Sequence, residues 1–388
     1  MSDGIKKITL RNGKVRYRTV IDVGRDAEGK RKQLTITKDT RTEVRDERAR
    51  IQHQRNAGTF VAPNKLTVSD LVDTWLTTAT RDVELATKRS YEDAMRYVRT
   101  HLGGKRLQEL TEEDVEALID WMLTSARRRG GKAGTGVGVR TVSLTLGRLR
   151  AALNLAVRRQ LVARNVAEHV TIPRAARKDD KANKKKYVPW TQEEVQQFLA
   201  HVASDRLHAV WLLSLIGLRP AEVAGLRWID LDLDAGILKV ETTRTMVAGV
   251  VVEKDAKSGA GERGLPLPEI VSKALKAFRK RQAKEQLAAG EGWHASGRVA
   301  CDELGAAVKT DWLRRRAYKA METAEVRKVR LYDARHACLS WMANNGVPDV
   351  VVSAWAGHAD LGFTKRIYVH SDPQALRAGS DKLGELLG

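Results

Sequence analysis

The segment 331–370 constrains this chain most, because it places four polar groups of three chemical kinds among apolar helical turns. Tyr332 and Arg335 are three residues apart, so on a helix they share a face. His358 directly follows a glycine, where a helix ends and a side chain can point out of the core. Tyr368 lies ten residues later, between two apolar residues. A guanidinium, an imidazole and a phenol that converge from separate elements suit a phosphate group.

Two further motifs stand upstream of this segment. An arginine box with the sequence GLRPAEVAGLRW carries Arg219. A glycine-containing turn with the sequence KSGAGERGLPL opens on Lys257. Each motif alone is a weak signal, whereas the complete set in this order is specific. The ordered set is Arg219, Lys257, Arg335, His358 and Tyr368.

This order resembles that of the tyrosine recombinases of the phage integrase family, by motif over residues 188–380 and by general pattern over 66–173. The second box of the family usually opens with histidine, whereas this chain has Tyr332. The resemblance implies an enzyme that cuts and rejoins DNA strands through a 3′-phosphotyrosine intermediate, with no cofactor and no metal. It also implies attachment sites in double-stranded DNA bound by a homo-tetramer, with an excisionase and a host DNA-bending protein as helpers.

The resemblance assigns a role to each group of the set. Arg219 and Arg335 bind the non-bridging phosphate oxygens, a task that suits forked donors that stay protonated at any working pH. Tyr368 is the nucleophile that becomes esterified to the DNA strand. Lys257 protonates the departing 5′ oxygen, and His358 hydrogen-bonds a phosphate oxygen.

Two neighbouring positions are assigned less directly. Glu222 stands three residues after Arg219 and is expected to orient an active-site side chain. Tyr332 carries a phenol with a pKa of about 10, which can donate a hydrogen bond but is a poor base near neutrality. Either Tyr332 only hydrogen-bonds the phosphate, or His336, one helical turn further, assists it. The first interpretation is favoured, because a histidine at the second place commonly has a packing role in the family.

Charge points to a polyanionic partner. The chain of 388 residues contains 69 Lys and Arg against 48 Asp and Glu, a net charge of +21, which favours nucleic acid. A membrane surface is the rival, but no apolar run approaches the roughly 20 residues of a spanning helix, and no signal peptide opens the chain. Two cysteines make a disulfide framework or a Cys-based zinc site unexpected, and the sequence contains no P-loop. We therefore expect a DNA-acting protein in a bacterial cytoplasm.

Residues 1–62 are predicted to form a small α+β module. Asn12-Gly13 is a hairpin signal, and residues 5–37 predict a three-stranded meander followed by a charged helix at 41–56. After the turn, basic and packing residues alternate, so one face of the sheet is basic. The module resembles the arm-type DNA-binding domain of some phage integrases; the alternative is a small solvated hairpin domain. The expected DNA-binding residues of the basic face are Lys14, Arg16 and Arg18.

Residues 63–173 are expected to be helical throughout and to form an all-α core-binding domain by the same resemblance. Two Thr-x-x-Asp segments, at 67–70 and 111–114, have capping-box form, and two apolar stripes at 4-3-4 spacing, within 91–102 and 142–153, predict core faces. A basic loop lies between the helices, and such a run can be a solvated surface or a phosphate contact. Its expected DNA-binding residues are Arg127, Arg128 and Arg129.

Residues 174–186 contain seven Lys or Arg and no apolar periodicity, which predicts a basic linker without regular structure in the absence of DNA. Its expected DNA-binding residues are Lys184, Lys185 and Lys186. Residues 187–388 are expected to form a mostly α catalytic domain with a small antiparallel sheet. Segments 237–242 and 247–252 predict hairpin strands around a turn at Ala248-Gly249, and 372–387 predicts a last helix that packs on its own domain or on a neighbouring protomer.

The leading functional interpretation is the integrase of a phage or integrative element, which integrates and excises that element. Three alternatives remain. A chromosome-resolving recombinase usually lacks a module like residues 1–62. A type IB topoisomerase-like enzyme uses the same chemistry but needs neither a tetramer nor matched sites. A DNA-binding regulator that has lost catalysis would have no need of the complete set of catalytic candidates.

Overall fold

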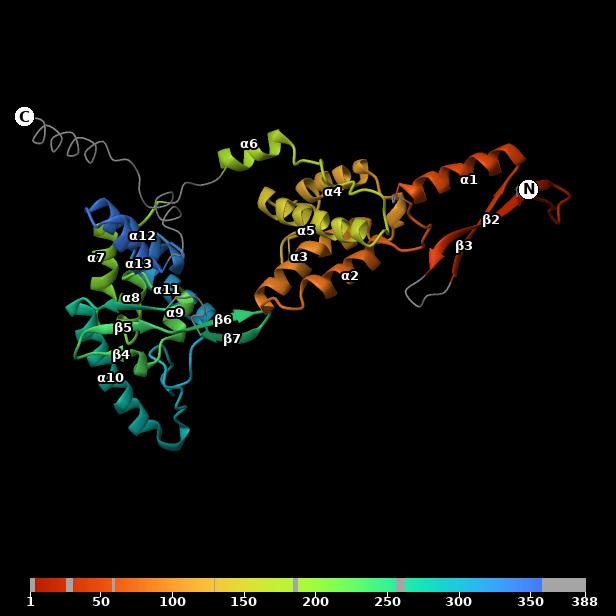
Figure 1. Cartoon of the computed structure of the whole chain (residues 1–388). Coiled ribbons are helices and arrows are strands. Elements are labelled where there is room, and N and C mark those ends of the chain that lie inside the picture. Colours follow the sequence, from red (N-terminus) through yellow and green to blue (C-terminus); the bar gives the residue numbers. More distant parts are fainter. Residues whose placement is uncertain are drawn as a thin grey trace, which may run out of the picture. The chain divides into compact units, whose positions relative to one another are not determined.

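The computed structural model describes residues 4–25, 31–57, 60–128, 130–183, 188–255 and 262–357. The chain divides into two compact units, Met1–Lys185 and Lys186–Gly388, and each is described by itself (Figure 1). Several predicted features lie outside the described residues, among them the last helix at 372–387. The predicted site residues outside them are Arg129, Lys184, Lys185, Lys186, Lys257, His358 and Tyr368.

The amino-terminal meander and its helix are confirmed. Strands β1 (Lys6–Thr9), β2 (Val15–Arg25) and β3 (Arg31–Lys38) pair antiparallel in the order β1-β2-β3. Gly13 has φ +77° in the first turn, a left-handed conformation that glycine adopts without strain. Helix α1 (Arg41–Asn56) begins at a capping box and packs on one face of the sheet (Figure 1).

Residues 63–173 contain five helical elements among those described. Both predicted capping boxes are present and set the starts of α2 and α4. Both predicted apolar stripes face the core; for example, Met95 and Leu149 are fully buried. Each such side chain contributes about 1.5–3 kcal/mol through removal from water. The elements are α2 (Val68–Ala79), α3 (Leu85–Leu102), η1 (Leu107–Glu109), α4 (Glu112–Thr124) and α5 (Val139–Arg158).

The prediction that residues 174–186 lack regular structure is wrong over most of the segment. Helix α6 (Arg174–Asn183) starts directly after Pro173, and Ala176 packs against the core of the helical domain. The alanines, arginines and lysines of α6 are good helix formers once its first turn is held, and proline immediately before a helix is well tolerated. A lack of apolar periodicity therefore did not mean a lack of helix.

The second unit is mostly helical, with two small sheets among its described residues. One sheet has the order β4-β5-β8 and the other is the hairpin β6-β7. Its helices are α7 (Gln192–His201), α8 (His208–Leu215), α9 (Pro220–Gly225), η2 (Trp228–Asp230), α10 (Glu269–Ala289), η3 (Gly290–Gly292), α11 (Thr310–Thr323), α12 (Leu331–Asn344) and α13 (Asp349–Ala356). Its strands are β4 (Leu231–Asp232), β5 (Ile237–Val240), β6 (Thr242–Val247), β7 (Val250–Asp255) and β8 (Arg263–Pro266).

The predicted pairing of segments 237–242 and 247–252 is wrong in its partners. The turn is where it was expected, with Ala248 at φ 50° and Gly249 at φ 87°, but β6 and β7 flank it. Strand β5 pairs instead with β4 and β8. The apolar alternation marks strand residues correctly, whereas strand pairing depends on contacts that the alternation does not encode.

The fold class is confirmed: a small α+β module and an all-α domain precede a mostly α domain with small antiparallel sheets. Among the described residues, no helix combines the length and hydropathy that a bilayer span requires.

Candidate active site

Arg219 is placed by a sharp turn between α8 and α9. Gly217, which follows the end of α8, has φ +98°, and a Cβ built there would lie 3.3 Å from the Cys338 sulfur. Both features favour glycine at this position. Pro220 then occupies the first turn of α9 and holds Arg219 in the extended conformation, at φ −67° and ψ 146°. The GLRP sequence thus ends one helix and starts the next, with Arg219 at the junction.

Glu222 holds Arg219 and also binds a second arginine. Within the described part of the chain, its carboxylate accepts from the Arg219 backbone N–H over 2.8 Å and from Arg219 Nη1 over 2.6 Å. It also accepts from Arg263 Nη1 and Nη2, over 3.1 and 3.0 Å. Burial by itself would raise the pKa of the Glu222 carboxyl, but these hydrogen bonds and the charges of Arg263 and Arg219 outweigh it and lower the pKa. Glu222 is therefore a buried anion that orients two guanidiniums.

Arg335 reaches the same region from α12. Its side chain is fully buried, and its Nη1 donates to the Gly217 carbonyl over 2.7 Å. Its Nη2 donates to the Ala356 carbonyl at the end of α13. Burial lowers the pKa of the Arg335 guanidinium to about 10, and the positive charge of Arg219 acts in the same direction. Arg335 therefore remains protonated near neutral pH.

The carboxyl end of α13 joins the arginines. Among the described residues, three successive carbonyls there accept from three different guanidiniums. Arg263 Nε donates to Trp355 over 2.8 Å, Arg335 Nη2 donates to Ala356, and Arg219 Nη2 donates to Gly357 over 3.4 Å. Carbonyls at a helix end lack partners within the helix and attract cations. Gly357, at φ 61°, ends the helix as predicted.

Arg263 lies in the motif that opens on Lys257, and no role was predicted for it. Its side chain is 7% exposed, and it contacts both Glu222 and the end of α13. No local pattern identifies such a residue. An arginine that follows a glycine-rich turn and opens a strand next to a buried leucine is the one available signal, and it is weak.

The charges of the site suit an anionic substrate. Among the described residues, Glu222 is the carboxylate shared by Arg219 and Arg263, and the charges of all three act on Arg335. One carboxylate offsets one of three guanidiniums, so this group carries an excess of positive charge in a poorly hydrated region, where charge interactions are strong. A phosphodiester, with one negative charge and oxygens that match guanidinium geometry, is the substrate class that this excess would stabilise.

Tyr332 and His336 lie on α12 beside this group. Tyr332 is 38% exposed, so although it is three residues from Arg335 it points toward solvent whereas Arg335 points into the core. Its ring packs edge-on against His336, with centroids 5.1 Å apart. Burial lowers the pKa of the His336 imidazole. A neutral, half-buried imidazole against a ring suits a packing role.

We expect Tyr332→His protein to retain strand cleavage within a few-fold, because either side chain can hydrogen-bond a phosphate oxygen. His336→Ala is expected mainly to lower the free energy of unfolding, by about 1 kcal/mol, through lost packing. Cleavage rates and urea denaturation of the two variants measure these effects. A folded His336→Ala protein that has lost cleavage would contradict the assignment of Tyr332 as the hydrogen-bonding residue.

The predicted DNA-binding residues of the first unit are held by local contacts. Lys14 and Arg16 pair with Asp39 at 3.3 and 2.7 Å. Arg18 Nε donates to the Thr37 hydroxyl across the strand pair over 3.2 Å. In the basic loop, Arg127 Nε donates to the Gly131 carbonyl over 2.7 Å, and Arg128 is exposed.

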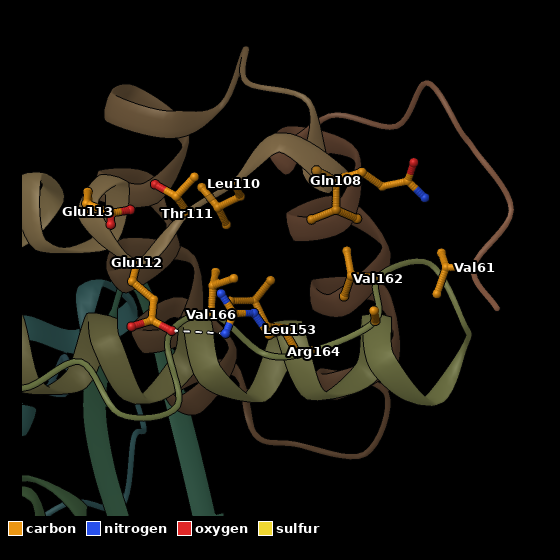
Figure 2. Close-up of a pocket in the computed structure, with 12 residues that line it drawn as sticks. Val61, Gln108, Leu110, Thr111, Glu112, Glu113, Leu153, Val162, Arg164 and Val166 are labelled. Carbon is orange, nitrogen blue, oxygen red and sulfur yellow. Dashed lines mark ion pairs between the residues drawn. The ribbon is translucent and has the colours of Figure 1, made fainter. Parts of the chain in front are cut away.

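Other features of the described residues carry no part of this site. In the described ranges, no group of three His, Cys, Asp or Glu could hold a metal ion. The helical domain has a cavity of about 660 Å³, lined both by apolar residues such as Leu110 and Val162 and by polar or charged ones such as Thr111 (Figure 2). Glu112 and Arg164 form an ion pair of 3.6 Å within its lining. None of the predicted catalytic residues lines this cavity.

Comparisons with known proteins place the chain among its relatives. The family model described as "Phage integrase family" matches residues 189–375, and that described as "Phage integrase SAM-like domain" matches residues 67–172. A protein of Caldanaerobacter subterraneus subsp. tengcongensis named "Tyrosine recombinase XerC-like" is 25% identical and covers 97% of this chain and 98% of its own. An "Integrase" of Streptomyces ambofaciens is 26% identical, over 91% of this chain and 89% of its own.

A solved structure has the same fold. The Tn1549 transposon integrase in complex with a circular intermediate DNA superposes with a TM-score of 0.66 at 19% identity. The superposition covers 82% of this chain and 99% of that one.

Proposed function

Since the chain belongs to the phage integrase family of tyrosine recombinases, whose members are site-specific DNA recombinases, we propose that it is the integrase of a phage or other mobile element. It integrates and excises that element by cutting and rejoining DNA through a 3′-phosphotyrosine bond. The observation that best supports this is the convergence of Arg219 and Arg335. They come from the α8–α9 junction and from α12, yet both bind the end of α13.

The arginines account for phosphate binding. Arg219 is 30% exposed at its side chain and can present donors to a phosphate while Glu222 holds its other edge. Arg335 lies beneath, where its charge adds to the local potential without solvent screening. In the transition state charge gathers on the non-bridging oxygens, so preorganised cations stabilise it more than the ground state.

The remaining roles come from the motif order. Tyr368 attacks the phosphorus and releases its hydroxyl proton to solvent, the bond to the 5′ oxygen breaks, and the 3′ phosphate of the strand becomes esterified to the tyrosine. Lys257 supplies a proton to the 5′ oxygen, His358 and Tyr332 hydrogen-bond the phosphate, and the ester conserves bond energy for rejoining. The reaction needs neither a nucleotide cofactor nor a metal.

A duplex with a nick close to the cleaved phosphate tests this function. Cleavage releases the short fragment, so the strand cannot be rejoined and the covalent complex accumulates. This complex should survive denaturation. Protease digestion should then leave a peptide that is joined to the DNA through a phosphotyrosine. Genomic fragments that the protein selects supply the site. Wild-type protein that binds such DNA and never forms the adduct would exclude both recombination and the topoisomerase alternative.

The chromosome-resolving alternative is separated by the first module. We propose that residues 1–62 bind arm-type DNA sites away from the crossover, as the integrase interpretation requires. Within the described part of the sheet, α1 covers the face that carries buried Ile21 and Ile36. The opposite face presents Arg16 and Arg18, the arrangement of β-ribbons that enter a DNA groove.

We expect the double substitution of Arg16 and Arg18 to alanine to weaken arm-site binding uniformly across sequences and to lower the slope of log K against log salt by about 2. The control is Arg50→Ala on α1, which removes an exposed arginine that pairs with Glu47 on the other side of the module. Fluorescence anisotropy over a salt series measures both. Equal losses in the two proteins would show that net charge matters and that the sheet face does not.

In this proposal the partners are double-stranded attachment-site DNA and three further copies of the chain, with an excisionase and a host DNA-bending protein acting in the bacterial cytoplasm. Two-site recombination assays with purified protein, with and without a cell extract, test them. Recombination by protein that stays monomeric on DNA would exclude the tetramer and favour the topoisomerase-like alternative.

A further inference from the structure

Arg263 connects three elements that are distant in sequence. It is the first residue of β8, directly beyond the turn that carries Lys257 in the sequence. Two of its guanidinium nitrogens bind the two oxygens of Glu222, and its Nε binds the Trp355 carbonyl. One side chain therefore links β8, the first turn of α9 and the last turn of α13.

Its first effect is on Arg219. Glu222 and Arg219 alone would form a neutral pair, which would offer little attraction to an anion. Arg263 binds the same carboxylate bidentately, so the trio carries a net positive charge and the carboxylate plane is fixed from both sides. The donors of Arg219 that Glu222 does not use are thereby aimed by a carboxylate that cannot rotate.

Its second effect is on α13. The bond to the Trp355 carbonyl fixes the last turn of this helix, and the next two carbonyls are bound by Arg335 and Arg219. These three bonds hold the carbonyls up to Gly357, the residue to which His358 is joined in the sequence. The same arginine thus acts on two members of the catalytic set.

We propose that Arg263 is a positioning residue for strand cleavage, which holds Glu222 and the end of α13 so that Arg219 and His358 meet one phosphate. The inference rests on the proposed function. It assigns Arg263 no contact with DNA. Its effect on the rate passes through Glu222 and the Trp355 carbonyl.

The alternative is that Arg263 only stabilises the fold. A second arginine of the same unit provides a matched control for this alternative. Arg206 makes the same kinds of contact elsewhere in the second unit. Its Nε and Nη2 bind Glu285 over 2.7 and 2.6 Å, and it donates to the carbonyls of Cys301 and Asp302, each over 2.8 Å. Its side chain is 15% exposed. Loss of Arg206 should therefore cost stability without touching the site.

The test compares Arg263→Gln, Arg263→Lys and Arg206→Gln in the full-length protein. The cleavage rate per folded molecule is measured on nicked duplex at saturating DNA. We expect Arg263→Gln to lower it roughly 10- to 100-fold, the scale of an ångström-sized misplacement, with a much smaller loss of DNA affinity from the one positive charge removed. The cleavage rate of Arg263→Lys should fall less than that of Arg263→Gln, and Arg206→Gln should cleave like the wild type. If Arg263→Gln does not fold, the lysine variant carries the comparison.

Two further readouts separate positioning from general loosening. Hydrogen exchange of the amides over 349–357, without DNA, should be on the order of 5-fold faster in Arg263→Gln, as for one lost hydrogen bond, and unchanged in Arg206→Gln. In cleavage, Glu222→Gln and Arg263→Gln should be non-additive, the double variant being no slower than the slower single one.

Unchanged exchange over 349–357, wild-type cleavage by Arg263→Gln, or additive losses would each overturn the inference. If the wild type forms no covalent adduct, the proposed function fails instead. The exchange experiment then still decides whether Arg263 holds the end of α13.

Discussion

Tyr368→Phe protein is expected to fold and bind attachment-site DNA like the wild type but to form no denaturation-resistant adduct. The substitution removes the one oxygen that the mechanism esterifies, so the loss should be on the order of 10⁶-fold in rate, as for other covalent nucleophiles. Gel analysis of nicked duplex under denaturing conditions measures it, and binding is checked on the same DNA without denaturant.

Tyr318→Phe on α11 is the matched control. Its ring lies under the Lys328 ammonium, at 4.3 Å, and it belongs to the same unit without being part of the catalytic set. Normal adduct formation by this variant would show that loss of a phenol in general has no effect. An adduct formed by Tyr368→Phe would mean that another residue is the nucleophile, and the assignment from motif order would fall.

Arg335→Lys is expected to lower the cleavage rate by about 10²-fold, because Arg335 ties the backbone next to Arg219 to the end of α13, and a misplacement of about 1 Å has an effect of this size. Lysine keeps the charge but offers a single nitrogen, whereas Arg335 uses two nitrogens on the Gly217 and Ala356 carbonyls. One of these buried carbonyls would be left without that donor, so the free energy of unfolding should also fall by roughly 1–3 kcal/mol. Single-turnover cleavage and urea denaturation measure the two effects.

The control for Arg335→Lys is Arg206→Lys, in which an arginine that also binds two backbone carbonyls is replaced outside the site. A similar stability loss with full cleavage is expected.

Because the pKa of Arg335 lies near 10, its deprotonation begins to matter only as the pH rises toward that value. If wild-type activity changes with pH near neutrality, the titration of another group must therefore cause the change. If that pH dependence disappeared in Arg335→Lys, the assignment of the change to another group would be wrong.

The local parts of the site could be predicted because short-range rules govern them. The glycine and proline around Arg219 end one helix and start the next, and Gly357 ends α13 where expected. Helix α6 was missed because its residues form a helix by propensity, with Ala176 as its anchor on the core. The strand pairing of β5 was missed because a pairing partner is a tertiary fact, although the turn at Ala248-Gly249 was located correctly.

The partners of the arginines could not be predicted. Arg335 binds a carbonyl 118 residues away in the chain, Arg263 one at 92 and Arg219 one at 138. No periodicity or spacing rule extends over such separations. The contrast between buried Arg335 and exposed Tyr332 on one helix likewise depends on which elements pack against α12.

The amino-acid sequence by itself determined the order of the proposed catalytic groups, the family and several helix starts and ends, because caps, turns and apolar periods act over a few residues. The tertiary structure alone decided that Glu222 is shared by two guanidiniums and that the end of α13 is bound by three arginines. These contacts exist only after distant segments have packed together, since burial creates both the unpaired carbonyls and the low dielectric that make a guanidinium their best partner.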